Sequence, residues 1–219
     1  MFNLVVKDIL IQKKRVLFAL LYIIFMVIAF QNMGLVMFTV GVTACTYMLI
    51  MTACAYEDMN KSDIMMNSLP VKKSQIVAAK YLSVFVFFIM GTLAYAAFYG
   101  VVKLTGIPLG ISPVNMTNLI SGITSVCFIS GIYLPIFFKV GYVKSKIINF
   151  VLFFSVFFGA SYLVTILQES MSIPWLNAII EFVSDRGETF TAIVFLALIL
   201  VFMFISYLIA LRLYKHREF

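Results

Sequence analysis

The chain has 219 residues, of which 63% are hydrophobic, 16% are aromatic and only 11% are charged. A typical soluble domain is about 25% charged, and a folded monomer of this size must present polar surface to water. The composition therefore excludes a cytosolic enzyme, a disordered chain and a disulfide-stapled secreted module. The remaining class is a polytopic membrane protein, with a single domain over residues 1–219.

Six runs of about 20 residues contain no charged side chain, and each run predicts a membrane-spanning helix. A strand exposed to lipid would leave its backbone polar groups unpaired, and the alternation typical of a β-barrel is absent. The predicted fold class is therefore all-α. In chain order the predicted spans are Val16–Met33, Leu35–Tyr56, Tyr81–Val102, Thr117–Phe138, Ile147–Leu167 and Phe190–Leu211.

Basic residues are divided unequally between the two sides of this predicted bundle. Of the 16 Lys and Arg, all but Lys103 and Arg186 lie in the N-terminal segment, the 2–3 loop, the 4–5 loop or the C-terminal tail. The positive-inside rule therefore places both termini in the cytoplasm. The same rule accounts for the net charge of +7 without a nucleic-acid partner.

Residues 1–15 are predicted to form an amphipathic helix in the cytoplasmic membrane interface, before the first span. One helical face, which we expect to lie toward lipid, carries the apolar residues Phe2, Val5, Val6 and Ile9. The basic cluster that follows, Lys13 to Arg15, would lie among anionic head groups. An unstructured basic leader is the alternative.

The 2–3 loop, residues 57–80, is the longest predicted cytoplasmic connection. It mixes both signs of charge with apolar side chains, and Pro70 interrupts it because the residue before a proline avoids the helical conformation. Apolar side chains in such a loop need a cover, which is either the membrane surface or a partner protein. Methionine suits an adaptable protein contact. The apolar set is Ile64, Met65, Met66 and Leu69.

The predicted external connection between spans 5 and 6, residues 168–189, is also largely apolar. Pro174 and Asn177 divide it into pieces that are too short to cross a bilayer. We therefore expect short external helices that are interfacial or re-entrant, with Trp175 as an interface anchor.

Residues that catalyse reactions or bind metals are scarce. The sequence lacks a GxxxxGK[ST] loop, its one histidine is His216 in the tail, and its three cysteines lie in apolar runs. We therefore expect no catalytic, cofactor or metal site in this chain. An ion-coupled carrier usually has an ionisable residue in mid-membrane, and the six predicted spans contain none.

Aromatic and hydroxyl side chains are the distinctive features of the spans. Span 5 carries a helical stripe of Phe150, Phe153, Phe154, Phe157 and Phe158. The stripe is either a packed or lipid-facing surface, or a wall for an amphipathic cargo. Hydroxyl groups could offer hydrogen bonds to such a cargo, and the candidates are Tyr22, Thr39, Thr43, Tyr47, Ser155 and Thr165.

Over its whole length the chain resembles the ABC-2-type permease subunits of bacterial ABC exporters, especially small Gram-positive permeases. The most specific match lies in the 2–3 loop. It consists of Glu57-Asp58, then Ser68-Leu69-Pro70-Val71, then Ile76-Val77 and Ala79-Lys80-Tyr81. In that family this loop forms the coupling helix that docks on a nucleotide-binding subunit.

The resemblance implies a non-enzymatic permease in the bacterial plasma membrane that pairs with a second permease copy or paralogue. Two ATPase subunits would bind ATP and Mg²⁺. The cargo would be hydrophobic or amphipathic, for example an antimicrobial peptide or a phenol-soluble modulin. Spans 1, 2 and 5 would line the cargo pathway or the dimer seam. The coupling residues would be Glu57, Asp58, Asn60, Lys61, Asp63, Ile64, Met65, Met66 and Leu69.

Two other readings compete with an exporter permease. One is a membrane scaffold or immunity protein without transport activity, and the other is an ion-coupled carrier. The uncharged spans disfavour the carrier. A scaffold gives no reason for an acidic, proline-interrupted and methionine-rich cytoplasmic loop.

Overall fold

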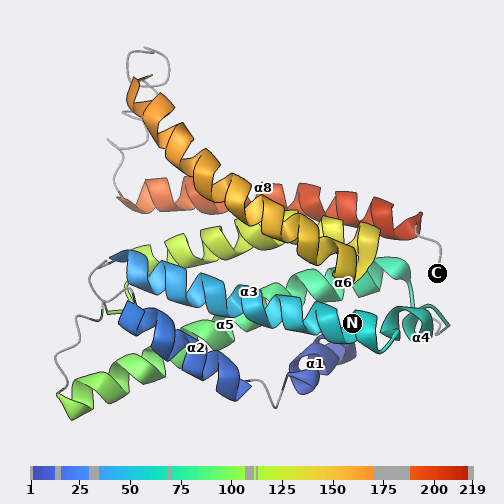
Figure 1. Cartoon of the computed structure of the whole chain (residues 1–219), viewed down its shortest axis with the longest axis horizontal. Coiled ribbons are helices and arrows are strands. Elements are labelled where there is room, and N and C mark those ends of the chain that lie inside the picture. The colour runs from blue at the N-terminus through green and yellow to red at the C-terminus, as the bar shows by residue number, and fades with distance from the viewer. Residues whose placement is uncertain are drawn as a thin grey trace.

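The structure is a computed structural model, and the described part of the chain is helical wherever it is regular (Figure 1). The description covers residues 2–12, 16–29, 35–68, 71–106, 111, 113–169 and 188–216, with the backbone alone over 149–169 and at positions 2, 16, 17, 19, 20, 35, 36, 63, 64, 67, 188, 189 and 192. The helices are α1 (Phe2–Ile11), α2 (Val16–Ala29), α3 (Leu35–Met59), α4 (Ser62–Ser68), α5 (Lys73–Thr105), α6 (Met116–Glu169) and α8 (Glu188–Lys215).

Four stretches within the described residues are long and apolar enough to cross a membrane. They are Met37–Met59, Lys73–Thr105, Met116–Ile148 and Ile193–Lys215. The all-α prediction and the helices expected for spans 2, 3, 4 and 6 are thus confirmed. Spans 1 and 5 correspond to α2, with 14 residues, and to the second half of α6. Their crossing of the membrane stays a prediction.

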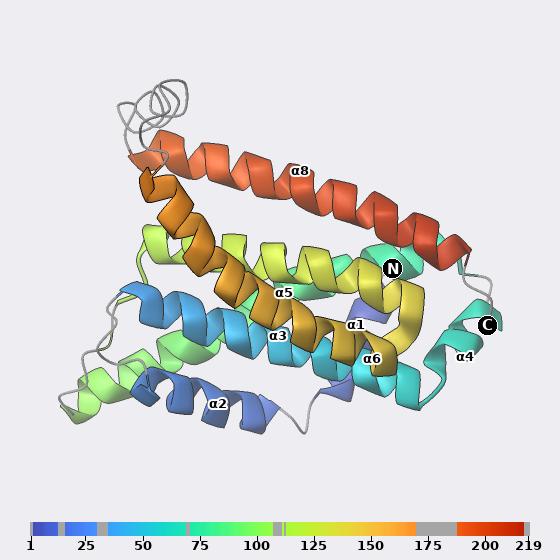
Figure 2. The same ribbon diagram turned by 45° about the horizontal axis from the view of Figure 1, so that its top comes forward.

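Helix α6 reverses direction at Gly141, which has φ 77° and ψ 178°. This conformation lies in a region that is essentially restricted to glycine. Figure 2 shows the two arms of α6 running in opposite directions from this turn. The predicted 4–5 loop is therefore a tight reversal between two helical arms, and its lysines lie on the helices.

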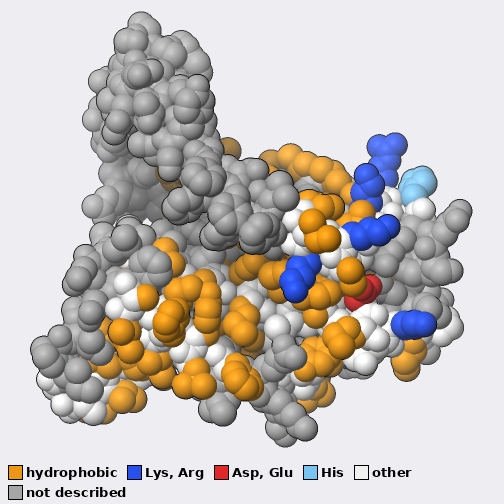
Figure 3. Space-filling view, in the orientation of Figure 1, with side chains coloured by type: hydrophobic (Ala, Val, Ile, Leu, Met, Phe, Trp, Pro, Cys, Tyr) orange, Lys and Arg blue, Asp and Glu red, His pale blue; other side chains and the backbone are white. Residues whose placement is uncertain are grey.

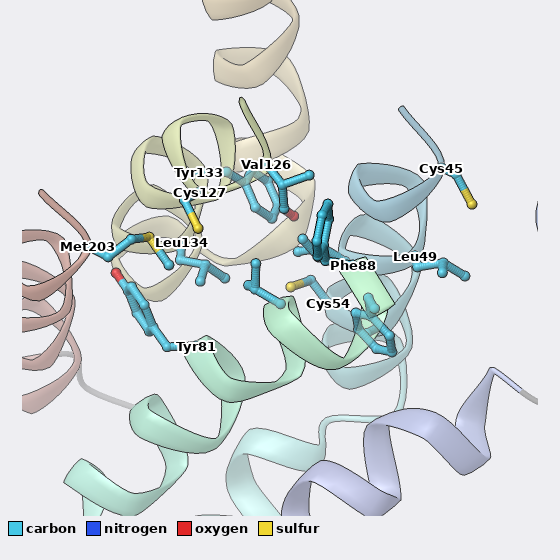
Figure 4. Packing of buried hydrophobic residues seen from close by; sticks show 14 of the residues in the cluster. Cys45, Leu49, Cys54, Tyr81, Phe88, Val126, Cys127, Tyr133, Leu134 and Met203 are labelled. Atoms are coloured by element: carbon cyan, nitrogen blue, oxygen red, sulfur yellow. The ribbon is translucent and has the colours of Figure 1, made fainter. Parts of the chain in front are cut away.

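The core lies where α3, α5 and the first arm of α6 meet. In Figure 4, side chains from these three helices point toward one another, among them Cys54, Phe88 and Leu134. Small residues allow the close approach, as is usual between membrane helices. A Cβ atom added to Gly122 would lie 3.2 Å from the Phe38 ring and 3.3 Å from the Phe88 ring.

Helix α8 packs on α6 and α5 along one side only. Its Ser206 hydroxyl donates to the carbonyl of Gly131 and lies 2.6 Å from the Tyr81 hydroxyl oxygen. These hydrogen bonds join α8 to both neighbours within an otherwise apolar contact. Most of the remaining surface of α8 is exposed and apolar.

The N-terminal helix forms as predicted, since residues 2–11 are helical, but the face predicted to lie toward lipid is wrong at Val5, although Val6 is exposed as predicted. Val5 is buried at 8% exposure, whereas Val6 and Leu10 are exposed. The reason is that α1 turns its polar side chains Asp8 and Gln12 into the bundle, where both are buried. The location of α1 in the membrane interface stays a prediction.

Some predicted features lie outside the described residues. These are the side chains of Phe2, Asp63, Ile64, Ser155 and Thr165, the side chains of Phe150, Phe153, Phe154, Phe157 and Phe158, the whole of Leu69, and nearly all of the external segment 168–189.

Candidate functional site: a charged junction below α4

Four charged side chains from α1, α3 and α5 meet at one end of the bundle. Lys80 Nζ lies 2.6 Å from Glu57 Oε2 and 3.3 Å from Asp8 Oδ2. Lys7 Nζ lies 2.9 Å from the other Glu57 oxygen, Oε1. We call these four residues the charged junction, and their formal charges cancel.

Three members of the charged junction are almost completely buried. The exposed fractions are 3% for Asp8, 4% for Glu57 and 5% for Lys80. Ser83 lies one turn beyond Lys80 on α5, and its hydroxyl donates to Asp8 Oδ2 at 3.0 Å. Buried charges persist only where they are paired and hydrogen-bonded. The close ion pairs and the Ser83 hydroxyl supply these partners here.

A further polar contact fixes α1 against α3. The Gln12 side chain is fully buried, and its Nε2 donates to the backbone carbonyl of Leu49. Gln12 lies in the turn directly after α1, four residues beyond Asp8, and both side chains are buried in the bundle. These contacts orient α1 with its polar residues inward.

Helix α4 contacts the charged junction through Met66 and exposes the preceding residue, Met65. Met66 is 6% exposed, and its Sδ lies 3.5 Å from Lys7 Nζ. Met65 is 68% exposed. A cavity of about 10 Å³ beside Met66, Leu4 and Ile76 has room for about one water molecule. The short helix therefore has an inner side tied to the bundle and an outer side open to a partner.

The structure separates the residues that were predicted to contact an ATPase. Glu57 belongs to the buried junction rather than to the surface. Asp58 is half-buried, and Asn60 and Lys61 are exposed in the turn that links α3 to α4. Lys61 has φ 49°, a left-handed conformation that reverses the chain there. Of the described side chains on α4, Met65 is the apolar one that is open to a partner.

Sequence reasoning assigned a functional role to Glu57 alone among the four members of the charged junction, and missed Lys7, Asp8 and Lys80. Lys80 was assigned to a cytoplasmic loop, but α5 begins at Lys73 and carries Lys80 into the packed bundle. Asp8 received no role. A signal was available, because Asp8 is the sole acidic residue before Glu57.

The predicted hydroxyl residues of α3 face the first arm of α6. Thr39 Oγ1 lies 2.8 Å from Ser121 Oγ, and the rings of Tyr47 and Tyr133 pack edge-to-face at 5.8 Å. Among the described residues, the buried hydroxyls of Thr43, Tyr47 and Tyr133 have no hydrogen-bond partner. Tyr133 was missed by the sequence reasoning.

Tyr22 lies apart from this row. It is half-buried on α2 and packs against the hydrophobic core. Four of the predicted hydroxyl residues lie outside the second arm of α6. Three of them, Thr39, Thr43 and Tyr47, lie together on α3, and Tyr133 of α6 joins them, whereas Tyr22 does not.

Comparison of the sequence with known protein families identifies the class of membrane protein to which this chain belongs. A family profile described as "ABC-2 family transporter protein" matches residues 3–215, nearly the whole chain. The chain belongs to the ABC-2 transporter family. No significant match was found among curated proteins or among solved structures.

As an ABC-2 permease, this chain is a transmembrane subunit of an ABC transporter, a type of subunit that associates with an ABC ATPase in the plasma membrane. Membership of this family favours transport over a membrane scaffold. The match includes α1, α4 and the charged junction, so these elements belong to the permease domain itself.

Proposed function

We propose that this permease is part of an exporter in which α4 receives the ATPase subunit. The observation that carries the proposal is the two-sided character of α4, with Met65 exposed and Met66 buried against Lys7. ATP and Mg²⁺ would be bound by the ATPase. Exposed Asn60 and Lys61 would complete the contact, together with Asp58, Asp63, Ile64 and Leu69.

The charged junction would carry a movement of α4 into the bundle. Met66 contacts Lys7, Lys7 is paired with Glu57, and Glu57 is paired with Lys80. Separating one of these pairs would leave a buried charge uncompensated, which costs several kcal/mol. A push on α4 is therefore expected to move α1 and the adjoining ends of α3 and α5 together.

The cargo that suits this permease is hydrophobic or amphipathic, and we propose a peptide. The predicted spans carry no charge that could select an ion in mid-membrane. The unpaired hydroxyls of Thr43, Tyr47 and Tyr133 could instead offer hydrogen bonds to backbone groups. The cargo would cross at the seam with a second permease, where we place the phenylalanine stripe of span 5 and Tyr22.

Replacing Met65 by Asp tests the role of α4. A charge on the exposed side should disrupt an apolar contact with the ATPase, because few buried anchors carry most of the energy of an interface. We expect transport and cargo-dependent ATP hydrolysis to fall about tenfold or more, at unchanged membrane insertion. Both activities would be measured in vesicles that contain the permease and its ATPase.

Val143→Asp is the matched control for this test. Val143 is 67% exposed, almost as much as Met65, but it lies on α6 next to the reversal. We expect this variant to keep both activities. Normal transport and ATP hydrolysis in Met65→Asp would show that α4 is not the coupling element.

The phenylalanine stripe is tested by Phe154→Ala and Phe157→Ala. A buried phenyl ring contributes roughly 1.5–3 kcal/mol relative to water, but much less relative to lipid, which is equally apolar. We therefore expect transport to change several-fold while the midpoint of thermal unfolding stays the same. Phe204→Ala is the control, since Phe204 is a 62% exposed side chain on α8. Equal transport in Phe154→Ala, Phe157→Ala and Phe204→Ala would instead indicate that the stripe faces lipid.

A further inference from the structure

One end of the molecule is strongly basic. Exposed lysines lie beside the reversal of α6, and Arg212 and Lys215 are exposed in the last turn of α8. Figure 3 shows the Lys and Arg side chains of that face gathered at this end. The rings of Phe138 and Tyr214, 5.1 Å apart, join the last turn of α8 to the first arm of α6 just before the reversal. Lys73 of α5 joins them by donating to the carbonyl of Lys215 at 3.4 Å.

The basic end of α8 continues into an exposed apolar stripe on the same helix face. Val201, Ile205 and Leu208 are 58%, 50% and 47% exposed, and Leu198 extends the stripe at 62%. These positions and Arg212 follow the helical i, i+3, i+4 spacing. Arg212 therefore lies on the same face of α8 as these apolar side chains, one turn beyond Leu208.

The length of this stripe fits one leaflet of a bilayer. Leu198 and Leu208 are ten residues apart, which is about 15 Å along a helix. Half of the hydrocarbon core of a bilayer is also about 15 Å thick. Arg212 and Lys215 then lie about 6–10 Å beyond the stripe, at the depth of the head groups.

We propose that α8 binds an anionic phospholipid. The phosphate lies beside Arg212 and Lys215, and an acyl chain lies along Leu198, Val201, Ile205 and Leu208. Charge complementarity selects an anionic head group over a zwitterionic one. This proposal is independent of the coupling role given to α4.

The observations favour a lipid over a protein at this surface. A protein interface typically has an apolar centre surrounded by a polar rim. This face of α8 is instead apolar along its length and basic at one end only. Within the described residues, α8 is also the least buried of the spanning stretches, with 22% of its most apolar window inside the molecule. That exposure suits contact with lipid chains.

Native mass spectrometry of the full-length permease tests the proposal. The chain would be transferred from micelles that contain equal amounts of phosphatidylglycerol and phosphatidylcholine, and the retained lipids counted. We expect a preference for phosphatidylglycerol of about tenfold or more in the parent. Each basic residue near an anionic surface strengthens binding about fivefold. Arg212→Gln combined with Lys215→Gln should therefore abolish most of the preference.

The control removes the same amount of charge elsewhere, with Lys61→Gln and Lys103→Gln, both at exposed positions away from α8. It should keep the preference, and an unchanged gel-filtration profile would confirm that all variants are folded. The proposal is overturned if the parent shows no preference, or if the α8 double variant retains it. Loss of the ATPase or of a second permease copy from the α8 variant, at unchanged lipid preference, would also overturn it, because the surface would then be a protein interface.

Discussion

Replacing Lys80 by Met is expected to lower the free energy of unfolding by about 3–5 kcal/mol. Lys80 is 5% exposed and lies within 3.4 Å of both Asp8 and Glu57. Methionine fills a similar volume, so the loss comes from an uncompensated buried carboxylate rather than from a cavity. In a chain of this size, the unfolding midpoint should fall by roughly 6–20 °C. Thermal unfolding in detergent micelles would measure the shift.

A second substitution separates charge from packing. Asp8→Asn in the Lys80→Met background leaves Lys7 paired with Glu57 and restores neutrality, so we expect it to recover a large part of the lost stability. Lys72→Met is the surface control. Lys72 is exposed at the start of α5, and its replacement should change stability by less than about 0.5 kcal/mol. An equal midpoint for Lys80→Met and Lys72→Met would contradict the junction described here.

Replacing Gly141 by Ala is expected to strain the reversal of α6 by about 1–3 kcal/mol. The backbone there has φ 77° and ψ 178°, a combination that a Cβ atom disfavours. The strain falls on the joint between the two arms of α6, so the second arm should be displaced and transport reduced along with stability. Thermal unfolding and ATP-dependent transport would be measured on the same preparation.

Gly100→Ala is the matched control for the reversal. Gly100 is inside α5, and a Cβ atom added there would meet nothing within 4 Å. Alanine favours a helix over glycine by about 1 kcal/mol, so this variant should be as stable as the parent or more stable. If Gly141→Ala behaved in the same way as Gly100→Ala, the tight reversal would be excluded.

Sequence reasoning was sufficient for features that depend on local composition. The long apolar runs predicted helices of spanning length at α3, α5, α6 and α8, because a backbone in lipid must satisfy its hydrogen bonds within the segment. The family resemblance in the 2–3 loop implied a coupling helix there, and the loop does contain a short helix, α4 at Ser62–Ser68. The matched family profile agrees with the resemblance seen in the 2–3 loop.

The same reasoning failed at Val5. An amphipathic helix next to a membrane usually places its apolar face in lipid, and on that basis Val5 was placed outward. The polar face of α1 is held inward by distant partners. Glu57, the partner of Lys7, lies 50 positions further along the chain, and Lys80, the partner of Asp8, lies 72 positions further. Periodicity within one helix carries no information about them.

The sequence by itself determined that this protein is an all-helical membrane permease of the ABC-2 family, because composition and local motifs carry that information. Only the tertiary structure decided which charges are structural. Lys80 and Lys72 are both lysines near the start of α5, yet one is buried in an ion-pair network and the other is exposed. The difference arises because burial depends on what packs against a residue, and here α1, α3 and α5 must meet before Lys80 is removed from water.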